Sequence, residues 1–409
     1  MYTEIKKCRV CDSTELDVVV SLGSQFLTGV FPKSTSEVIT KGPLDVVWCK
    51  TCNLLQLKHS YNLDELYGDN YGYRSGLNAS MVRHLEHKIH FLERLASPCE
   101  NDLVIDIGSN DATSLKAYKG EFQKVGIDPT GKKFKKYYTD NIHLISDFFS
   151  AEVFLTHFPN KKAKIVTSIA MFYDLERPLD FIRDIHAVLS DDGIWHFEQS
   201  YMPTMLRTNS YDTICHEHLE FYSLTVVANM LKTCDLRIID VQMNATNGGS
   251  FAITACKSQA HYVSNSPVIN WLLKQEAQMG LNTKKPYKEF ADRIEKHRHN
   301  LFDLIEALVN DGKKVIGYGA STKGNVLLQY CGLTNKHLSC IAEVNEEKFG
   351  SFTPGTNIPI VSEKEARAMN PDYFLVLPWH FKHGILDREK DFLARGGKFI
   401  FPLPEIEIV

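Results

Sequence analysis

The stretch LVIDIGSNDATSLKA, residues 103–117, decides the fold of the central part of the chain. Its apolar beginning predicts a buried strand, Gly108 opens a turn through Ser-Asn-Asp, and the residues that follow have the composition of a helix. A strand that ends in a glycine-containing turn before a helix places backbone amides where a ligand can approach closely. The stretch therefore predicts an α/β unit with a ligand site at this turn.

Other segments on both sides of this stretch have the same character. Strands that alternate with amphipathic helices imply crossover connections and a largely parallel sheet. Helical spacing of apolar residues over 290–309 leads into a further α/β unit. The expected strands cover residues 102–108, 122–128, 163–170, 193–200, 251–256, 313–319, 338–344, 373–378 and 398–403.

The length of 409 residues is more than one domain usually needs. We expect a small strand-rich domain over residues 1–65, an α/β domain over 66–257 and a second α/β domain over 258–409. The net charge of −4, from 46 basic and 50 acidic side chains, argues against nucleic acid or anionic membrane as a partner. The amino terminus lacks the apolar core of a secretory signal. These features predict a cytoplasmic protein, either a monomer or a weak dimer.

Two C-x-x-C pairs mark the amino-terminal segment, Cys8 with Cys11 and Cys49 with Cys52. In a reducing compartment, closely spaced cysteines indicate metal ligands rather than disulfides. Four thiolates can hold Zn²⁺ in a closed tetrahedral site of structural type. Reduced core cysteines and a redox motif are the alternatives, but a redox motif needs a single pair. We favour zinc.

The central turn predicts the kind of cofactor. Its single glycine departs from G-x-G-x-x-G and fits poorly around a pyrophosphate, which disfavours an NAD-dependent oxidoreductase. Asp128 ends the second strand, where a carboxylate can bind ribose hydroxyls. S-adenosylmethionine has no phosphate and carries cationic groups that suit acidic surroundings, and S-adenosylhomocysteine would be its product. The residues expected to bind it are Asp106, Gly108, Asn110, Asp128, Asp147 and Phe148. Asp147 has an alternative as the N-cap of the following helix.

The segment over residues 198–223, EQSYMPTMLRTNSYDTICHEHLEFYS, holds the densest chemistry. A metal site is disfavoured because the two histidines of H-E-H do not lie on one face of a helix, whereas the histidines of H-E-x-x-H do. A structural histidine is a second interpretation, and general base catalysis by a neutral imidazole is the third. Carbon methylation needs such a base to remove a proton α to a carbonyl. We prefer His218 as the base, with Glu217 as its partner and His216 in reserve.

Taken in order, these motifs resemble the bacterial sugar C-methyltransferases that make branched deoxysugars. The resemblance covers essentially the full length and includes YGYRS at residues 71–75 and GASTKGN at residues 319–325. It implies a zinc-binding domain, a class I S-adenosylmethionine-dependent methyltransferase domain with a Rossmann-like fold, and a carboxy-terminal Rossmann-like domain that binds substrate. The family's substrates are 4-keto-6-deoxyhexoses linked to a nucleoside diphosphate.

The resemblance also implies roles for individual residues. The base would be His218 with Glu217 beside it, acting on C3 through an enediolate, and Tyr73 would lie near the cofactor and the reacting carbon. Tyr222 is a further catalytic candidate. The residues expected to bind the substrate are Tyr71, Ser75, Tyr201, Asn209, Ser321, Lys323 and Asn325. For Ser321 and Lys323, a helix start that holds a diphosphate competes with an ordinary turn and a solvated lysine.

Cys215 departs from the family pattern, which has tyrosine immediately before H-E-H. A thiol lacks the reach and hydrogen bond of a phenol. Either Tyr211 or Tyr222 takes its place, or the substrate differs. Two other functions stay open. One is O- or N-methylation of a sugar or other polar metabolite, and the other is a zinc-containing binding protein with a degenerate methyltransferase fold.

Overall fold

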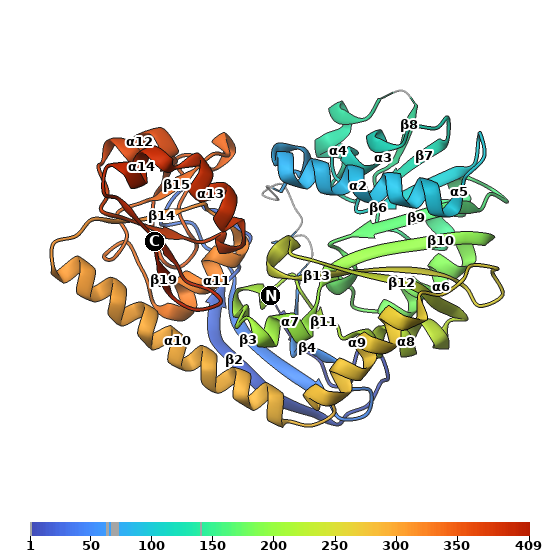
Figure 1. Cartoon of the computed structure of the whole chain (residues 1–409), viewed down its shortest axis with the longest axis horizontal. Helices are drawn as coiled ribbons and strands as arrows, with labels where there is room; N and C mark the ends of the chain where they lie inside the picture. The colour runs from blue at the N-terminus through green and yellow to red at the C-terminus, as the bar shows by residue number, and fades with distance from the viewer. Residues whose placement is uncertain (1, 63–64, 67–72, 140) are drawn as a thin grey trace.

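The computed structural model describes residues 2–62, 65–66, 73–139 and 141–409. Figure 1 shows two α/β lobes, one coloured cyan to olive and one orange to red, above the amino-terminal strands β2 (Leu16–Phe26) and β3 (Lys41–Cys49). Along the described chain, no helix is both long enough and apolar enough to cross a membrane.

The central lobe is built on a sheet whose strand order is β12 (Leu236–Asn244), β13 (Ser250–Lys257), β10 (Leu189–Ser200), β9 (Ala163–Ile169), β6 (Leu103–Ile107), β7 (Gln123–Ile127) and β8 (Ile142–Ile145). Neighbours from β10 to β8 are parallel, whereas β13 is antiparallel to both β10 and β12. The largely parallel sheet is confirmed, with an antiparallel edge. Every residue of β6 is buried, which explains its β-branched composition.

The helices of this lobe are α2 (Ala79–Ala96), α3 (Thr113–Ala117), α4 (Gly131–Phe134), α5 (Ala151–His157), α6 (Pro178–Val188), α7 (Met202–Arg207) and α8 (Leu224–Thr233). Single 3-10 turns are η1 (Ser75–Leu77), η2 (Lys135–Tyr137), η3 (Phe172–Asp174), η4 (Tyr211–Thr213), η5 (Thr246–Gly248), η6 (Glu346–Lys348) and η7 (Trp379–Phe381). The helix expected after the central turn is short, because Tyr118 leaves the helical conformation.

The amino-terminal strands form a separate sheet with the order β11 (Glu220–Phe221), β4 (Leu55–Leu57), β3 and β2. A second small pairing joins β1 (Tyr2–Glu4) to β5 (His59–Tyr61). β11 belongs to the central part of the sequence, and its Glu220 pairs with Gln56 of β4. The amino-terminal sheet is therefore completed by a strand that directly follows the H-E-H motif.

The carboxy-terminal lobe has a sheet with the order β16 (Ile360–Ser362), β15 (Ile341–Glu343), β14 (Val315–Tyr318), β17 (Tyr373–Val376), β18 (Lys398–Phe401) and β19 (Glu407–Ile408). Its strands are parallel except β19. Its helices are α11 (Thr322–Cys331), α12 (Glu363–Ala368), α13 (Lys382–Arg388) and α14 (Lys390–Ala394), and the connection from the central lobe passes through α9 (Ser266–Met279) and α10 (Lys285–Asn310).

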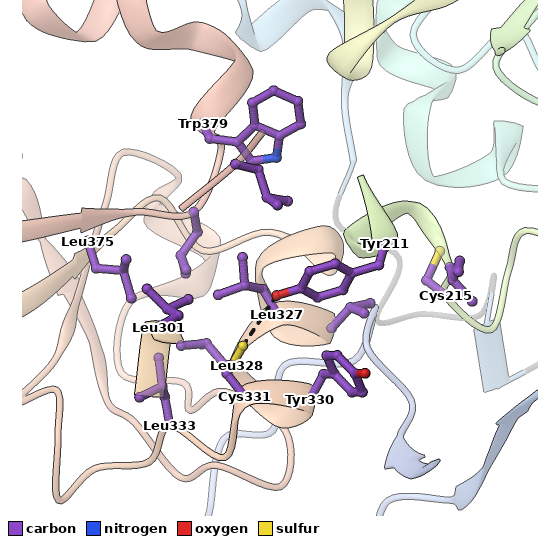
Figure 2. Close-up of a cluster of buried hydrophobic side chains, with 14 of the residues drawn as sticks. Tyr211, Cys215, Leu301, Leu327, Leu328, Tyr330, Cys331, Leu333, Leu375 and Trp379 are labelled. Atoms are coloured by element: carbon purple, nitrogen blue, oxygen red, sulfur yellow. Dashed lines mark hydrogen bonds between the residues drawn. The ribbon is translucent and has the colours of Figure 1, made fainter. Parts of the chain in front are cut away.

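One core joins this lobe to the rest of the chain. Figure 2 shows Tyr211 pointing toward α11, where its hydroxyl lies 3.3 Å from the Cys331 sulfur. The same hydroxyl is 3.1 Å from Nδ1 of His297 in α10. The segment before H-E-H is thereby fixed in the carboxy-terminal core.

Glu276 performs a similar role between α9 and α8. Its buried carboxylate accepts hydrogen bonds from the Tyr201 hydroxyl at 2.7 Å and from the backbone amides of Leu224 and Thr225 at 2.6 and 2.8 Å. The amides belong to the first turn of α8, where donors have no partner within the helix. This single side chain therefore caps one helix from another.

We expect Glu276→Ala to lower the free energy of unfolding by about 2 kcal/mol or more, because several buried donors lose their acceptor together. Denaturant unfolding followed by tryptophan fluorescence would measure the change. Glu276→Gln keeps a carbonyl acceptor and should lose less than Glu276→Ala. Equal unfolding midpoints for Glu276→Ala and the wild type would contradict this role.

Candidate active site

The turn after β6 lies at the carboxyl edge of the central sheet. Gly108 adopts a φ of 71°, which only glycine takes readily, and a Cβ there would lie 3.3 Å from the Met171 side chain. Beneath the turn, Asp106 is buried and accepts a hydrogen bond from Thr167. Burial raises the pKa of Asp106 to about 7, and the Thr167 hydrogen bond opposes the shift.

The tail of the YGYRS motif lies on this turn. Asn110 accepts from the Ser75 amide at 3.0 Å and donates to the Tyr73 carbonyl at 3.1 Å. The Gly76 amide donates to Asp111 at 3.0 Å. The structure thus brings together Tyr73, Ser75 and the cofactor turn, and Tyr73 keeps 50% of its surface exposed there. Tyr71 lies outside the described residues.

Asp128 is at the end of β7, next to the same turn. Its carboxylate accepts from the Asn110 amide and the Thr130 amide, both at 2.7 Å. Asp147 and Phe148 follow β8 at the same edge of the sheet, and Phe148 is 53% exposed. The alternative role of Asp147 as a helix cap is wrong, because α5 starts later and Ser150 caps it.

Sequence reasoning missed Tyr138, which supports the turn from below. Its hydroxyl lies 2.7 Å from the Ser109 hydroxyl and 3.0 Å from the Asn110 carbonyl. Burial raises the pKa of Tyr138. No local pattern distinguishes this tyrosine from its neighbour Tyr137, since the contact depends on the packing of η2 against the turn.

These residues fit S-adenosylmethionine. Gly108 is exposed at the turn, Asp128 and Asp147 follow the ends of adjacent strands, and Phe148 offers an exposed apolar face. Carboxylates at strand ends can bind ribose hydroxyls and an exocyclic amine.

His218 is oriented by its own loop. Its Nδ1–H donates to the Thr213 carbonyl at 2.8 Å, which leaves Nε2 as the unprotonated nitrogen. Its ring packs edge-on against Tyr173, with 4.3 Å between ring centroids. Burial, and then the Lys323 ammonium, lower the pKa of His218 to about 3, so the imidazole is neutral near pH 7.

Glu217 lies between three parts of the chain. A Cβ at Gly29 would be 2.1 Å from its Oε1 and 3.7 Å from the Thr322 hydroxyl, so the Glu217 carboxyl group lies against the loop after β2. Burial raises the pKa of Glu217, and a hydrogen bond with Cys215 opposes this shift. Cys215, which stands where the family pattern has tyrosine, therefore contacts the carboxyl group of Glu217 with its thiol.

The neighbouring aromatic residues point elsewhere. His216 is fully buried and packs edge-on against Tyr61 at 4.6 Å, and burial lowers its pKa to about 3. Tyr222 stacks on Phe172 in the central core, and Figure 2 shows Tyr211 and Cys215 directed to different sides. The structure therefore does not bring His216, Tyr211 or Tyr222 to His218.

Two further candidates also serve the packing. The Tyr201 hydroxyl is used by Glu276, as described above. Asn209 accepts from the Arg293 guanidinium at 2.9 Å and donates to the Pro404 carbonyl at 3.3 Å. Both side chains are used in contacts that connect the central lobe to α9, α10 and the carboxy-terminal lobe.

The first turn of α11 faces the H-E-H loop, but its residues differ in role. The Ser321 hydroxyl caps the helix by accepting from the Gly324 amide at 3.0 Å. Asn325 is buried and donates to the Thr28 carbonyl at 2.8 Å. Lys323 donates to the Asn247 carbonyl at 2.7 Å, and it acts electrostatically on His218 and Asp212. Of the three, Lys323 shares the His218 site.

Asp212, which belongs to the segment singled out in the sequence, and His380, which was not predicted, both interact electrostatically with Lys323. Asp212 is buried and accepts from the Trp379 indole at 2.9 Å, while burial, and then Lys323, lower the pKa of His380 to about 3. Within the described part of the chain, Oδ1 of Asp212, Nδ1 of His380 and Oε2 of Glu217 are buried without a hydrogen-bond partner. Trp379 and His380 directly follow the predicted strand YFLVLP. Because ligands bind at strand ends, this position in the sequence could have indicated both residues.

The four predicted cysteine ligands converge. Their sulfurs all lie within 4.8 Å of one another, with Cys8 and Cys52 at 3.6 Å and Cys11 and Cys49 at 3.5 Å. Zn–S bonds of about 2.3 Å in a tetrahedron separate the sulfurs by about 3.8 Å. The cluster therefore fits a structural zinc ion.

Comparison with known proteins gives three successive family matches. A zinc binding domain matches residues 8–67, a methyltransferase domain matches residues 80–241, and a C-methyltransferase C-terminal domain matches residues 245–404. The chain is also 32% identical over 411 residues to the C-methyltransferase NovU of Streptomyces niveus, covering 99% of this chain and 97% of that protein.

Two solved methyltransferase structures are similar to less than half of the chain. The magnesium protoporphyrin IX methyltransferase of Synechocystis PCC 6803 is 13% identical, with a TM-score of 0.34 over 47% of this chain and 91% of its own. The 1,6-didemethyltoxoflavin-N1-methyltransferase of Burkholderia thailandensis is 10% identical, with a TM-score of 0.33 over 45% and 83%.

We expect the purified protein to carry one zinc ion per chain that resists chelation, because the ion is held by four thiolates. Cys49→Ser should lose that ion to a chelator, whereas Cys99→Ser should keep it, since Cys99 is exposed and outside the cluster. Metal analysis after dialysis measures both. Full zinc retention by Cys49→Ser would contradict the assignment.

Lys323→Met should raise the pKa of His218, because it removes a positive charge that disfavours the imidazolium. Nitrogen-15 NMR of labelled histidines, titrated downward from neutral pH, would follow the ring, and a His218→Asn spectrum would assign it. Lys336→Met, at an exposed position of the same lobe, should leave the titration unchanged. An unmoved or lowered pKa in Lys323→Met would refute the electrostatic contact.

Proposed function

Because the chain belongs to the C-methyltransferase family and is an S-adenosylmethionine-dependent enzyme, we propose that its acceptor is C3 of a nucleotide-linked 4-keto-6-deoxyhexose. A carbon next to a ketone carries an acidic hydrogen, and its removal creates the nucleophile that methylation needs. The same carbon offers a base a single proton to remove. A general base is therefore the first requirement of the site.

The orientation of His218 is the observation that carries this proposal. Its Nδ1–H is committed to the Thr213 carbonyl, so Nε2 is the nitrogen that can accept a proton. A low pKa keeps that nitrogen unprotonated before the substrate arrives. The ring also lies against Tyr173 of η3, the turn that follows β9 at the ligand edge of the central sheet.

In the proposed step the C3–H bond breaks and its proton moves to Nε2 of His218. The electron pair forms the C3–C4 double bond and the C4 oxygen becomes the enediolate oxygen. Lys323, held by the Asn247 carbonyl, supplies the positive charge that stabilises this oxygen. S-adenosylmethionine, when bound, supplies the methyl group to C3 and leaves as S-adenosylhomocysteine.

The remaining residues orient and enclose the acceptor. Glu217 lies between the β2–β3 loop and α11, so its carboxyl group is placed by both neighbouring domains. Asp212 and His380 offer polar atoms that the described protein itself does not satisfy. Buried polar atoms of this kind favour a polar ligand such as a sugar. Tyr73 and Ser75 stand on the cofactor side, on the central turn.

We expect His218→Ala to lower both deuterium exchange at C3 and methyl transfer by about 100-fold or more, as loss of a general base does. The assay incubates the enzyme with S-adenosylmethionine and a panel of 4-keto nucleotide sugars in D₂O, and reads the products by mass spectrometry. His216→Asn is the matched control, because that neighbouring ring packs on Tyr61 of β5 whereas His218 packs on Tyr173, and it should retain exchange.

Each other outcome changes the proposal in a defined way. Methyl gain by the wild type without exchange, on an oxygen of the product, would favour O-methylation. Cofactor binding without methyl gain on any sugar would exclude this acceptor class. Full exchange by His218→Ala would remove His218 as the base while leaving the family unchanged.

A further inference from the structure

The first cysteine pair encloses a buried arginine. Arg9 lies between Cys8 and Cys11 in sequence, and its side chain is 2% exposed. Its guanidinium donates to the Leu57 carbonyl at 2.6 Å, to the Ser60 hydroxyl at 2.8 Å and to the Glu176 carboxylate at 3.1 Å. A zinc knuckle needs no such residue, because four thiolates complete its site.

Gln56 connects the same knuckle to β4. Its side-chain amide donates to the Cys8 sulfur at 3.1 Å and accepts from the Arg9 backbone amide at 3.1 Å. Glu220, directly across the β4–β11 pairing, is buried with its carboxylate 3.8 Å from the Arg9 guanidinium. Burial raises the pKa of Glu220, and the nearby Arg9 charge opposes this shift.

The backbone carries these contacts to the H-E-H loop. The Leu57 amide donates to the Leu219 carbonyl at 2.8 Å, and the Leu219 amide donates to the Tyr173 carbonyl at 2.8 Å. Leu219 follows His218 directly, and Tyr173 is the residue whose ring contacts His218. Glu176, which Arg9 also binds, lies just beyond Tyr173 in the chain.

We propose that Arg9 is a positioning residue for His218. It connects the zinc-binding cysteine pair to the strand that follows His218 and to the η3 segment whose Tyr173 ring contacts His218. One guanidinium binds the Leu57 carbonyl of β4 and, through Glu176, the segment after η3, and it lies 3.8 Å from Glu220 of the strand that follows His218. The assignment rests on the proposed role of His218 for its effect on catalysis, but the backbone coupling stands apart from it. An error of about 1 Å at a base can cost about 100-fold in rate.

The test compares Arg9→Met, Arg9→Lys and Arg177→Met in the full-length, zinc-loaded protein. Arg177 is a matched control, since it neighbours Glu176 but pairs with Asp180 on the surface, with its side chain 80% exposed. Measurements are zinc per chain, amide hydrogen exchange at Leu57 and Leu219, and kcat and KM for methyl transfer. The exchange measurement needs no substrate.

We expect Arg9→Met to keep its zinc and to lose about tenfold or more of the amide protection at Leu57 and Leu219, with unchanged protection in β6 and β14. Its kcat should fall about 10- to 100-fold while KM for S-adenosylmethionine changes less than about twofold. Arg9→Lys, which keeps a cation at the site, should recover part of both losses. Arg177→Met should behave as the wild type.

Wild-type protection of Leu219 in Arg9→Met would overturn the inference. So would a loss of protection spread evenly over all three sheets, because that pattern means general destabilisation. A wild-type protein with no activity on any 4-keto sugar would defeat the proposed acceptor instead, and the amide exchange of Arg9→Met would still decide this proposal.

Discussion

The pairing of β11 with β4 is the contact on which the arrangement of the chain depends. It places two residues of the central sequence, Glu220 and Phe221, in the amino-terminal sheet, immediately after H-E-H. Tyr211, on the other side of the motif, is fixed by its hydroxyl in the carboxy-terminal core. The H-E-H loop is thus anchored at both ends, in the amino-terminal sheet and in the carboxy-terminal core. Because strand pairing and core burial fix the backbone, the loop has little freedom to move without separating the domains.

Burial of polar groups around this loop opposes stability. Burial raises the pKa of Asp212 and of Glu217, and lowers that of His218. Buried ionisable groups cost free energy of folding unless hydrogen bonds or opposite charges compensate them. Of these groups, Asp212 interacts favourably with the Lys323 ammonium. A fold selected for stability alone would place apolar residues here. Their concentration where three domains meet is typical of a site at which a ligand completes the hydrogen bonding.

Local patterns predicted the elements well and the partners of side chains poorly. The strand at 102–108 and the turn at Gly108 followed from composition and from the need for a positive φ, which are properties of adjacent residues. Ser321 and Asn325 were both predicted to bind the substrate. The structure uses one as a helix cap and the other as a bond to Thr28, because α11 packs against the amino-terminal loop.

The sequence by itself determined the four cysteines that converge and the α/β lobes, since each depends on spacing within short segments. Tertiary structure alone decided which histidine faces the site. His216 and His218 are two residues apart, yet one packs on Tyr61 and the other on Tyr173. It also placed Cys215 against Glu217 and Arg9 beside Glu176. The contacts of His216 with Tyr61 and of Arg9 with Glu176 join segments that are far apart in the sequence, and they depend on how the sheets pack, which no local window of sequence contains.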